Sequence, residues 1–470
     1  VNLAQDNWNF AVVVSRSMRI NIYLISFLLL AFQQSGLSQF NLGFSLFNNA
    51  PVVIGVDTLA MPWAGGLNNP QFSSVDIDSG MFGVSDLFVY DRDGGIRKSF
   101  IFDPSEGSYT WLAYAEKYFP RIKERGFCQL RDYNGDGKPD LFASNNEGDK
   151  VMVYRNISDS ILKFEKVTNT LKFKLTGSPI GNFVVNYQSI PILEDFNGDG
   201  DLDIMQYMST LKGTDCGVFV LFESQSMDDF GVPDSLKYLV TNKCWGKLGN
   251  GGGLPGWRNY SCDTTCNSSD QQRNDVAITQ AAHDINGDGS LDLLLSYTHD
   301  AKIYAYTNTG DNTTGWIDLG LTDNTFPSYS TSVNIQNMPA PYFIDVDHDG
   351  YTDMLVAANQ FNTLTNEMDT AQSTLVDHFY RNNGSTSSPS FQLEKAGYLS
   401  GEMIDVGIRS FPTLIDLTGD GLLDLVIGNI GYNIYGANSP ATLTYFKNVG
   451  SQGFPAFKLI TKDLANASMF

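Results

Sequence analysis

Five short stretches with nearly the same pattern constrain this chain more than any other feature. Each has oxygen-bearing side chains at positions 1, 3, 5 and 9 and a glycine at position 6, and the clearest example runs from Asp284 to Asp292. This alternation lets a tight loop direct several oxygens onto one point, and the glycine adopts a backbone angle that other residues resist. Such a point suits a hard divalent cation, Ca²⁺ before Mg²⁺.

The pattern recurs at intervals of 63, 89, 61 and 71 residues. The loops start at Asp132, Asp195, Asp284, Asp345 and Asp416. A degenerate sixth copy starts at Asp76, where Gly80 occupies the fifth position and the final carboxylate, Asp86, comes two residues late. We therefore expect about five cation sites and a weak sixth one, with a second weak site at the Asp416 loop, whose third position is Thr418.

The predicted metal ligands are the odd-numbered positions of the five loops together with three aspartates of the degenerate copy. They are Asp132, Asn134, Asp136, Lys138, Asp140, Asp195, Asn197, Asp199, Asp201, Asp203, Asp284, Asn286, Asp288, Ser290, Asp292, Asp345, Asp347, Asp349, Tyr351, Asp353, Asp416, Thr418, Asp420, Leu422, Asp424, Asp76, Asp78 and Asp86. Position 7 is expected to offer only its backbone carbonyl, because lysine, tyrosine and leucine are all tolerated there.

An EF-hand shares the first six positions of this pattern but requires a bidentate glutamate at position 12. Position 12 is occupied here by Ala143, Gln206, Leu295, Val356 and Ile427. The EF-hand interpretation therefore fails in all five loops. The sequence around each loop is also typical of strands, with apolar runs such as 354–357 bounded by turn residues.

Each unit reads as strand, loop, strand, strand, strand over roughly sixty residues, which is the pattern of a β-propeller blade. We expect an all-β propeller over residues 39–470 with six to seven blades, seven being favoured for the intact protein. Two strands predicted at 40–47 and 52–57 would share the last blade with the C-terminal part of a truncated chain. The long 89-residue interval predicts an insertion at about 213–279.

The loops resemble the calcium-binding FG-GAP/VCBS repeats of integrin α-subunit propellers and of secreted Bacteroidetes-type proteins. The resemblance covers about residues 70–460, and the stretch 62–72 and the segment Asp91-Arg92-Asp93-Gly94 are similar to the secreted type. It implies Ca²⁺ bound in a hairpin between the first two strands of each blade. In such a closed shell the metal is structural, so we expect a chelator to lower thermal stability and protease resistance.

Composition excludes several classes of protein. With 30 Lys+Arg and 52 Asp+Glu the net charge is −22, which argues against nucleic-acid binding. Charged residues make up only 17% of the chain and hydrophobic ones 42%, so an acidic disordered chain is also excluded. The 44 glycines and 13% aromatic residues favour an all-β protein with many tight turns.

Residues 1–38 are interpreted as an upstream extension followed by a signal peptide. Met18-Arg19 precedes a short apolar core at 20–32 and small residues up to Ser38. This predicts a secreted or cell-surface protein without a membrane span after cleavage, with a membrane anchor as the alternative.

Four of the five cysteines fall in the predicted insertion. In an exported protein Cys216, Cys244, Cys262 and Cys266 predict two disulfides, with Cys216–Cys244 and Cys262–Cys266 preferred and a zinc site as the alternative. The fifth, Cys128, is expected to be a buried apolar residue rather than a reactive thiol.

No nucleophile elbow, zinc-protease motif or phosphate loop occurs in the sequence. The four histidines are expected to be scaffold or surface residues, and Trp63, Trp245 and Trp257 to pack internally rather than stack on sugars. We expect a monomeric adhesion or ligand-binding module for a protein or glycan, without enzymatic activity. A carbohydrate-active propeller enzyme, such as a polysaccharide lyase, is the alternative.

Overall fold

The computed structural model divides the chain into two units, 1–49 and 50–470. The residues that it describes are 48–78, 84–146, 150–185, 189–208, 218–250, 257–259, 278–297, 300–308, 323–336, 338–359, 375–407, 409–434 and 437–469. The predicted signal peptide and the predicted strand at 40–47 lie outside these residues. No helix among them is long and apolar enough to cross a membrane.

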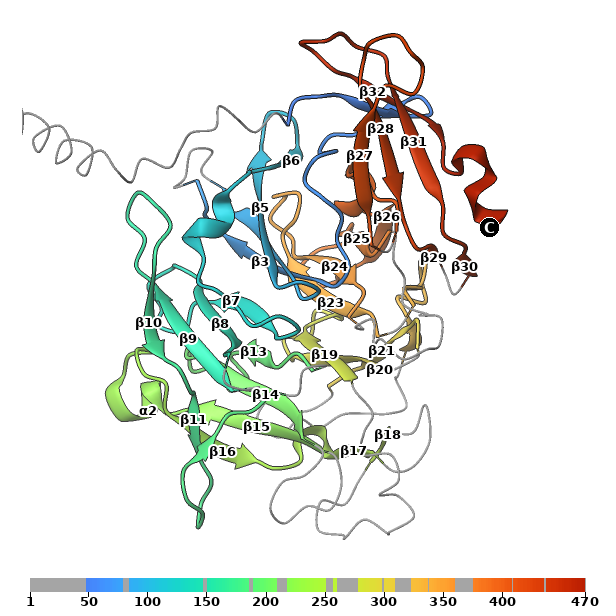
Figure 1. Cartoon of the computed structure of the whole chain (residues 1–470). Helices are drawn as coiled ribbons and strands as arrows, with labels where there is room; N and C mark the ends of the chain where they lie inside the picture. The colour runs from blue at the N-terminus through green and yellow to red at the C-terminus, as the bar shows by residue number, and fades with distance from the viewer. Residues whose placement is uncertain are drawn as a thin grey trace, which may run out of the picture. The chain divides into compact units, whose positions relative to one another are not determined.

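The second unit is built from repeated antiparallel β-sheets, as the loop spacing predicts (Figure 1). Five consecutive groups of four strands follow one another along the chain. They are β3 (Pro70–Val75), β4 (Asp86–Asp91), β5 (Ile96–Asp103) and β6 (Ser108–Trp111); β7 (Cys128–Arg131), β8 (Asp140–Ser144), β9 (Val151–Asn156) and β10 (Phe164–Thr168); β13 (Ile192–Glu194), β14 (Asp203–Met208), β15 (Val218–Ser224) and β16 (Tyr238–Asn242); β19 (Ile278–His283), β20 (Asp292–Tyr297), β21 (Ile303–Tyr306) and β22 (Asp323–Phe326); β23 (Ala340–Ile344), β24 (Asp353–Ala357), β25 (Asp377–Asn382) and β26 (Phe391–Ala396).

A sixth sheet combines both ends of this unit. Its four blade strands are β27 (Phe411–Ile415), β28 (Asp424–Gly428), β31 (Leu443–Asn448) and β32 (Phe457–Thr461). The N-terminal β1 (Val52–Ile54) pairs parallel with β32 and antiparallel with β2 (Asp57–Thr58). Each of the six sheets thus has the strand order of a propeller blade, with additional strands at the outer edge of two of them.

The second strand of each sheet is wholly or almost wholly buried. Every residue of β8, β20 and β24 is buried, which confirms the prediction of strands covered on both faces. Val153, Phe142 and Leu355 are among the side chains that pack between sheets with no exposed surface. Each sheet buries its faces only against its neighbours, so the fold depends on the series of sheets.

The first strands of the first five sheets lie next to one another (Figure 1). β3 contacts β7, β13 contacts β19, β19 contacts β23, and β23 contacts β3. All five line one small shared pocket of about 40 Å³. Glutamines reach across the gaps between sheets: the Cys128 N–H donates to Gln71 Oε1 (2.7 Å) and Gln129 Nε2 donates to the Pro191 carbonyl (2.8 Å).

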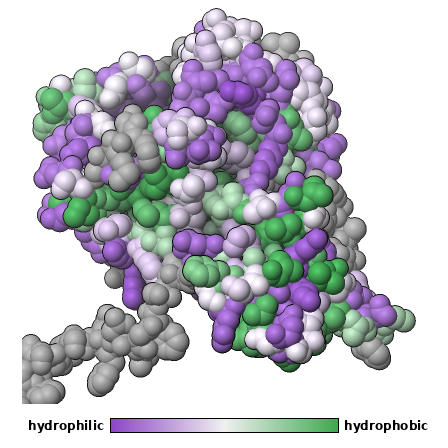
Figure 2. All heavy atoms as spheres, turned by 90° about the horizontal axis from the view of Figure 1, so that it is seen from above, coloured by the Kyte–Doolittle hydropathy of each residue, from purple (hydrophilic) through white to green (hydrophobic). Residues whose placement is uncertain are grey.

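The first strand of the sixth sheet is placed differently. It does not line the pocket shared by the other five, and all five residues of β27 are exposed. On the face seen in Figure 2, hydrophobic residues are scattered between hydrophilic ones. β27 and the loop after it carry five exposed apolar residues: Phe411, Leu414, Ile415, Leu417 and Leu423. The same sequence pattern therefore gives a buried strand in five sheets and an exposed one in the sixth.

Part of the insertion predicted at 213–279 belongs to the third sheet itself. β15 and β16 are its third and fourth strands, joined through the short helix α2 (Ser226–Phe230). After β16 the chain adds two further strands to this sheet: β17 (Leu248–Asn250), which pairs with β15, and β18 (Trp257–Asn259), which pairs with β17. β11 (Lys172–Lys174) and β12 (Gly181–Asn182) extend the same sheet at its outer edge.

Cys128 is of its predicted kind: it is free and buried, and burial raises the pKa of its thiol. Cys244 is buried. Cys216, Cys262 and Cys266 lie outside the described residues, so the predicted pairing stays a prediction.

Candidate metal centre

Each predicted loop connects the first and second strands of its sheet. In the five complete loops the aspartate at position 1 organises the turn by accepting N–H groups from the loop backbone. Gly137 and Gly200, at position 6, donate to Asp132 Oδ2 (2.7 Å) and Asp195 Oδ2 (2.9 Å). The position-7 N–H donates to the carboxylate at position 5, as from Ser290 to Asp288 (2.8 Å). These bonds fold the odd-numbered residues into a tight loop.

Two positions of each complete loop adopt the left-handed backbone region, not one. Position 6 does so as predicted, with φ of 81° at Gly137. Position 4 does so as well, and four loops carry glycine there, whereas the fifth carries His348 with φ of 58°. The recurrence of glycine at position 4 was the sequence signal for this requirement, and the prediction overlooked it.

In three loops, those with Gly135, Gly287 and His348, position 4 is also where the loop meets the next sheet. A side chain on Gly287 would collide with the backbone of Ser387 in the fifth sheet, 2.2 Å from an added Cβ. The His348 ring packs on Phe102 of the first sheet, with centroids 4.3 Å apart. The fifth loop is therefore braced by the first sheet, which helps to explain why a non-glycine residue tolerates the left-handed conformation there.

The aspartate at position 9 links three parts of its sheet. It begins the second strand, is fully buried in all five complete loops, and accepts two backbone N–H groups. Asp140 binds the N–H groups of Tyr133 (3.2 Å), at position 2, and Asn156 (2.7 Å), at the end of the third strand. The same two bonds recur at Asp203, Asp292, Asp353 and Asp424. The sequence predicted a ligand here but not this link to the third strand.

The buried carboxylates of Asp140, Asp203, Asp292 and Asp353 are held in an environment that disfavours their charge. Burial raises the pKa of Asp353 to about 7, against the lowering effect of the N–H groups of Asn382 and Val346. Nearby Asp347 and Asp349 raise it further through like-charge repulsion. The pKa of Asp203 rises to about 8 and that of Asp140 to about 7, again mainly through burial. A bound cation would reverse this cost, because it favours the ionised form.

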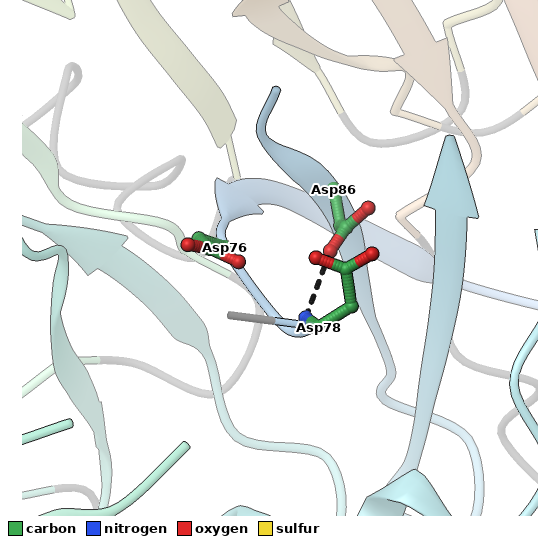
Figure 3. A group of neighbouring side chains, drawn as sticks. All are labelled: Asp76, Asp78 and Asp86. Carbon is green, nitrogen blue, oxygen red and sulfur yellow. Dashed lines mark hydrogen bonds between the residues drawn. The ribbon is translucent and has the colours of Figure 1, made fainter. Parts of the chain in front are cut away.

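Two loops bring three carboxylates close enough to share one ion. The ligand oxygens of Asp345, Asp347 and Asp353 lie within 4.8 Å of one another. So do those of Asp76, Asp78 and Asp86 in the degenerate loop, where the Asp78 N–H also donates to Asp86 Oδ2 (3.3 Å; Figure 3). Because Asp86 groups with Asp76 and Asp78, it takes the place that the aspartate at position 9 has in the complete loops. Gly80 lies outside the described residues.

Carboxylate oxygens in two of the complete loops are buried without a hydrogen-bond partner among the described residues, Asp345 Oδ1 and Asp201 Oδ1 among them. Buried carboxylate oxygens without partners are costly, and a hard cation prefers such ligands. The donor set therefore fits a metal ion of that kind, and the full ligand set predicted from the sequence stays a prediction.

The residue at position 3 divides the five complete loops into three kinds, with asparagine, aspartate or threonine there. Where it is asparagine, the amide donates to the carboxylate at position 5, as from Asn286 to Asp288 Oδ2 (3.0 Å). Where it is Asp347, the carboxylate is ion-paired with Arg381. The loop with Thr418 offers one carboxylate fewer than the loop with Asp347. In this loop Asp420 Oδ2 lies 3.5 Å from Lys447 Nζ.

The described histidines and tryptophans behave as internal packing residues. His283 stacks on Phe343 at 4.1 Å, and burial lowers its pKa to about 4. His378 is buried, with its pKa also lowered to about 4. Trp245 has no exposed surface, and Trp63 donates from Nε1 to the Ala50 carbonyl (2.7 Å). His299 and the Trp257 side chain lie outside the described residues.

Residues 132–205 and 284–356 match the sequence profile of the FG-GAP-like repeat. Each match begins at position 1 of a loop and ends in the second strand of the next sheet. The chain therefore contains FG-GAP-like repeats, in agreement with the resemblance of its loops. No curated protein matches the chain.

Several solved structures are distantly similar. An Agrocybe aegerita lectin, in a structure describing recognition of non-reducing terminal N-acetylglucosamine, is 13% identical, with 86% of this chain and 83% of that chain covered and a TM-score of 0.28. Prolyl oligopeptidase B from Galerina marginata is 9% identical over 84% of this chain and 47% of that one, with a TM-score of 0.24. A crystal structure of TcdB2-TccC3 is 11% identical, with 83% of this chain and 19% of that chain covered and a TM-score of 0.28. At these scores the similarities carry no argument about function.

Proposed function

We propose that this chain is a secreted or cell-surface Ca²⁺-binding β-propeller that serves as an adhesion or ligand-binding module for a protein or a glycan. The observation that carries the proposal is the recurrence of one acidic loop at the same place in successive four-stranded sheets. Two matches to the FG-GAP-like repeat span four of these loops. A repeated closed loop stabilises a scaffold, whereas a catalytic metal needs an open coordination position.

Calcium is preferred over magnesium because of the ligands on offer. Each complete loop presents several carboxylate, amide or hydroxyl oxygens on a flexible turn, whereas Mg²⁺ demands near-ideal octahedral geometry and keeps several waters. About five such ions and a weaker sixth are proposed, one for each loop. The ions would neutralise part of the net charge of −22.

We take the six larger sheets as propeller blades, and the count of six to seven blades is part of this proposal. The contacts of the first strands support five neighbouring blades, because β3 contacts β7, β13 contacts β19, β19 contacts β23 and β23 contacts β3. The exposed β27 lies outside this series, so the place of the sixth sheet in a ring is a proposal as well.

The experiment is a binding screen of the full chain against immobilised glycans and extracellular-matrix proteins, with Ca²⁺ and with excess chelator. The proposed function predicts at least one ligand that is captured with Ca²⁺ and released by the chelator. Absence of capture under both conditions would overturn it. Incubation of the same glycans followed by detection of unsaturated sugar products tests the lyase alternative, and such products would replace the binding role by an enzymatic one.

A further inference from the structure

A cavity of about 220 Å³ lies beside the sixth sheet, away from the acidic loops. Its walls come from the connection between the fifth and sixth sheets, from β1, and from β31 and β32. At roughly 30 Å³ for each water molecule, it has room for about seven. That is smaller than the usual site for a drug-sized ligand and suits one small ring.

Most of the wall is apolar. Met403, Val406 and Phe446 are buried and line it together with Leu459 and Ile54. These side chains offer a surface to C–H groups, and Phe446 is the aromatic residue among them. An apolar wall alone would stay dry, so the polar groups decide what the cavity can hold.

Two polar atoms of the lining residues are buried without a hydrogen-bond partner among the described residues: the Ser400 hydroxyl oxygen and Asp405 Oδ2. Asp405 Oδ1 accepts the Gly407 N–H (2.9 Å), but Oδ2 is buried and has no hydrogen-bond partner among the described residues. Burial raises the pKa of Asp405 to about 7, opposed by Lys462 and Lys98. A buried carboxylate oxygen without a partner is costly, and a ligand that donates a hydrogen bond would remove this cost.

The charges around the cavity select against ions. Asp405 would repel an anion, and Lys462, which also lines the cavity, would repel a cation. A neutral group that both donates and accepts satisfies the two together. Hydroxyl groups do this, and the hydroxyls of Ser400 and Thr444 in the same wall are of the same kind.

We propose that this cavity binds a neutral polyhydroxylated six-membered ring, the size of one monosaccharide unit. One hydroxyl of the ring donates to Asp405 Oδ2, another accepts from Lys462, and the C–H face of the ring lies on the wall formed by Phe446 and its apolar neighbours. The proposal rests on the ligand-binding role proposed above and names one of its sites and the class of ligand.

The test is calorimetric titration of the Ca²⁺-loaded chain with D-glucose, D-galactose and D-mannose. We expect at least one to bind, and Asp405→Asn to weaken that binding at least tenfold, because the unpaired acceptor is lost. Leu459→Trp, which fills the cavity from a partly exposed position, is expected to abolish binding. Asp57→Asn, an exposed change on the same sheet, is the matched control and should leave the affinity unchanged.

No binding of any of the three sugars, or binding that survives both cavity variants, would overturn the proposal. Circular dichroism of each variant establishes that it is folded. Failure here together with Ca²⁺-dependent capture in the ligand screen would leave the proposed function standing and remove only this site. Binding of a sugar in this cavity without any capture in the screen would support this site and remove the proposed Ca²⁺-dependent capture of larger ligands.

Discussion

The fifth and sixth sheets carry the same loop in different surroundings. Asp353 and Asp424 each accept one N–H from position 2 and one from the end of the third strand, at distances between 2.7 and 3.2 Å. Yet β23 is largely buried, whereas every residue of β27 is exposed. At position 4, His348 packs against the first sheet, while no atom of the described residues approaches within 4 Å of a Cβ added to Gly419.

The comparison separates two levels of structure. The loop and its links to the second and third strands form in both sheets, so they do not depend on a covered first strand. The burial of the first strand does not, because it depends on which sheet lies beside it. Stability of the loop and stability of the packed series of sheets are therefore expected to respond to different substitutions.

The largest expected effect is the loss of the buried aspartate. Asp353→Ala leaves two buried N–H groups without an acceptor, which costs about 2–6 kcal/mol at about 1–3 kcal/mol each. Asp424→Ala breaks the same two bonds, but in a sheet whose first strand lacks a neighbour, so it should weaken a local unfolding step rather than the main transition. Urea denaturation and hydrogen exchange in the presence of chelator check this without a contribution from metal.

The isosteric Asp353→Asn keeps one acceptor and should fall between the wild type and Asp353→Ala. Equal destabilisation of the main transition by Asp353→Ala and Asp424→Ala would show that the two sheets unfold together. That result would end the distinction drawn between them.

An intermediate effect is expected from the first strands. Tyr342 packs edge-on against Phe72 of the first sheet at 5.5 Å, so Tyr342→Ala should cost about 3–5 kcal/mol. Leu414 of β27 is 56% exposed, so Leu414→Ala should change stability by less than about 0.5 kcal/mol. Thermal and urea denaturation measure both.

Tyr342→Phe is the control for the packing argument. The Tyr342 hydroxyl is buried and has no partner among the described residues, so its removal should be neutral or slightly stabilising. A large loss with Tyr342→Phe, or a large loss with Leu414→Ala, would contradict the assignment of these two strands.

The smallest effect concerns the third loop position. Asp347→Thr removes a carboxylate from the fifth loop, and Thr418→Asp adds one to the sixth, so Ca²⁺ affinity should fall and rise respectively by about tenfold, or about 1.4 kcal/mol. Terbium luminescence titration, with competition by Ca²⁺, measures each site. Unchanged affinity in both variants would mean that position 3 is not a ligand.

The repeated unit could be predicted from the sequence because it depends on residues that are close together in the chain. Alternating oxygens from Asp284 to Asp292, the glycine at position 6 and the apolar runs after each loop suffice for the loop and the second strand. The left-handed backbone at position 4 could also have been predicted, because four of the five loops have glycine there and only His348 departs from this pattern.

Other features depend on residues far apart in the chain. The bond from Asp140 to the N–H of Asn156 needs the third strand to return beside the loop, and no spacing rule reports it. The parallel pairing of β1 with β32 joins segments about 400 residues apart. The exposure of β27 could not be predicted either, since its sequence reads like that of the buried first strands.

The most direct measurement is a melting curve of the full chain with saturating Ca²⁺, with excess chelator, and after Ca²⁺ is restored, accompanied by metal analysis. If the loops hold structural Ca²⁺, the melting temperature falls in chelator and recovers with Ca²⁺, because binding to the folded state alone adds to its stability. An unchanged melting temperature in all three conditions, with no bound calcium found, would contradict the structural role assigned to these loops.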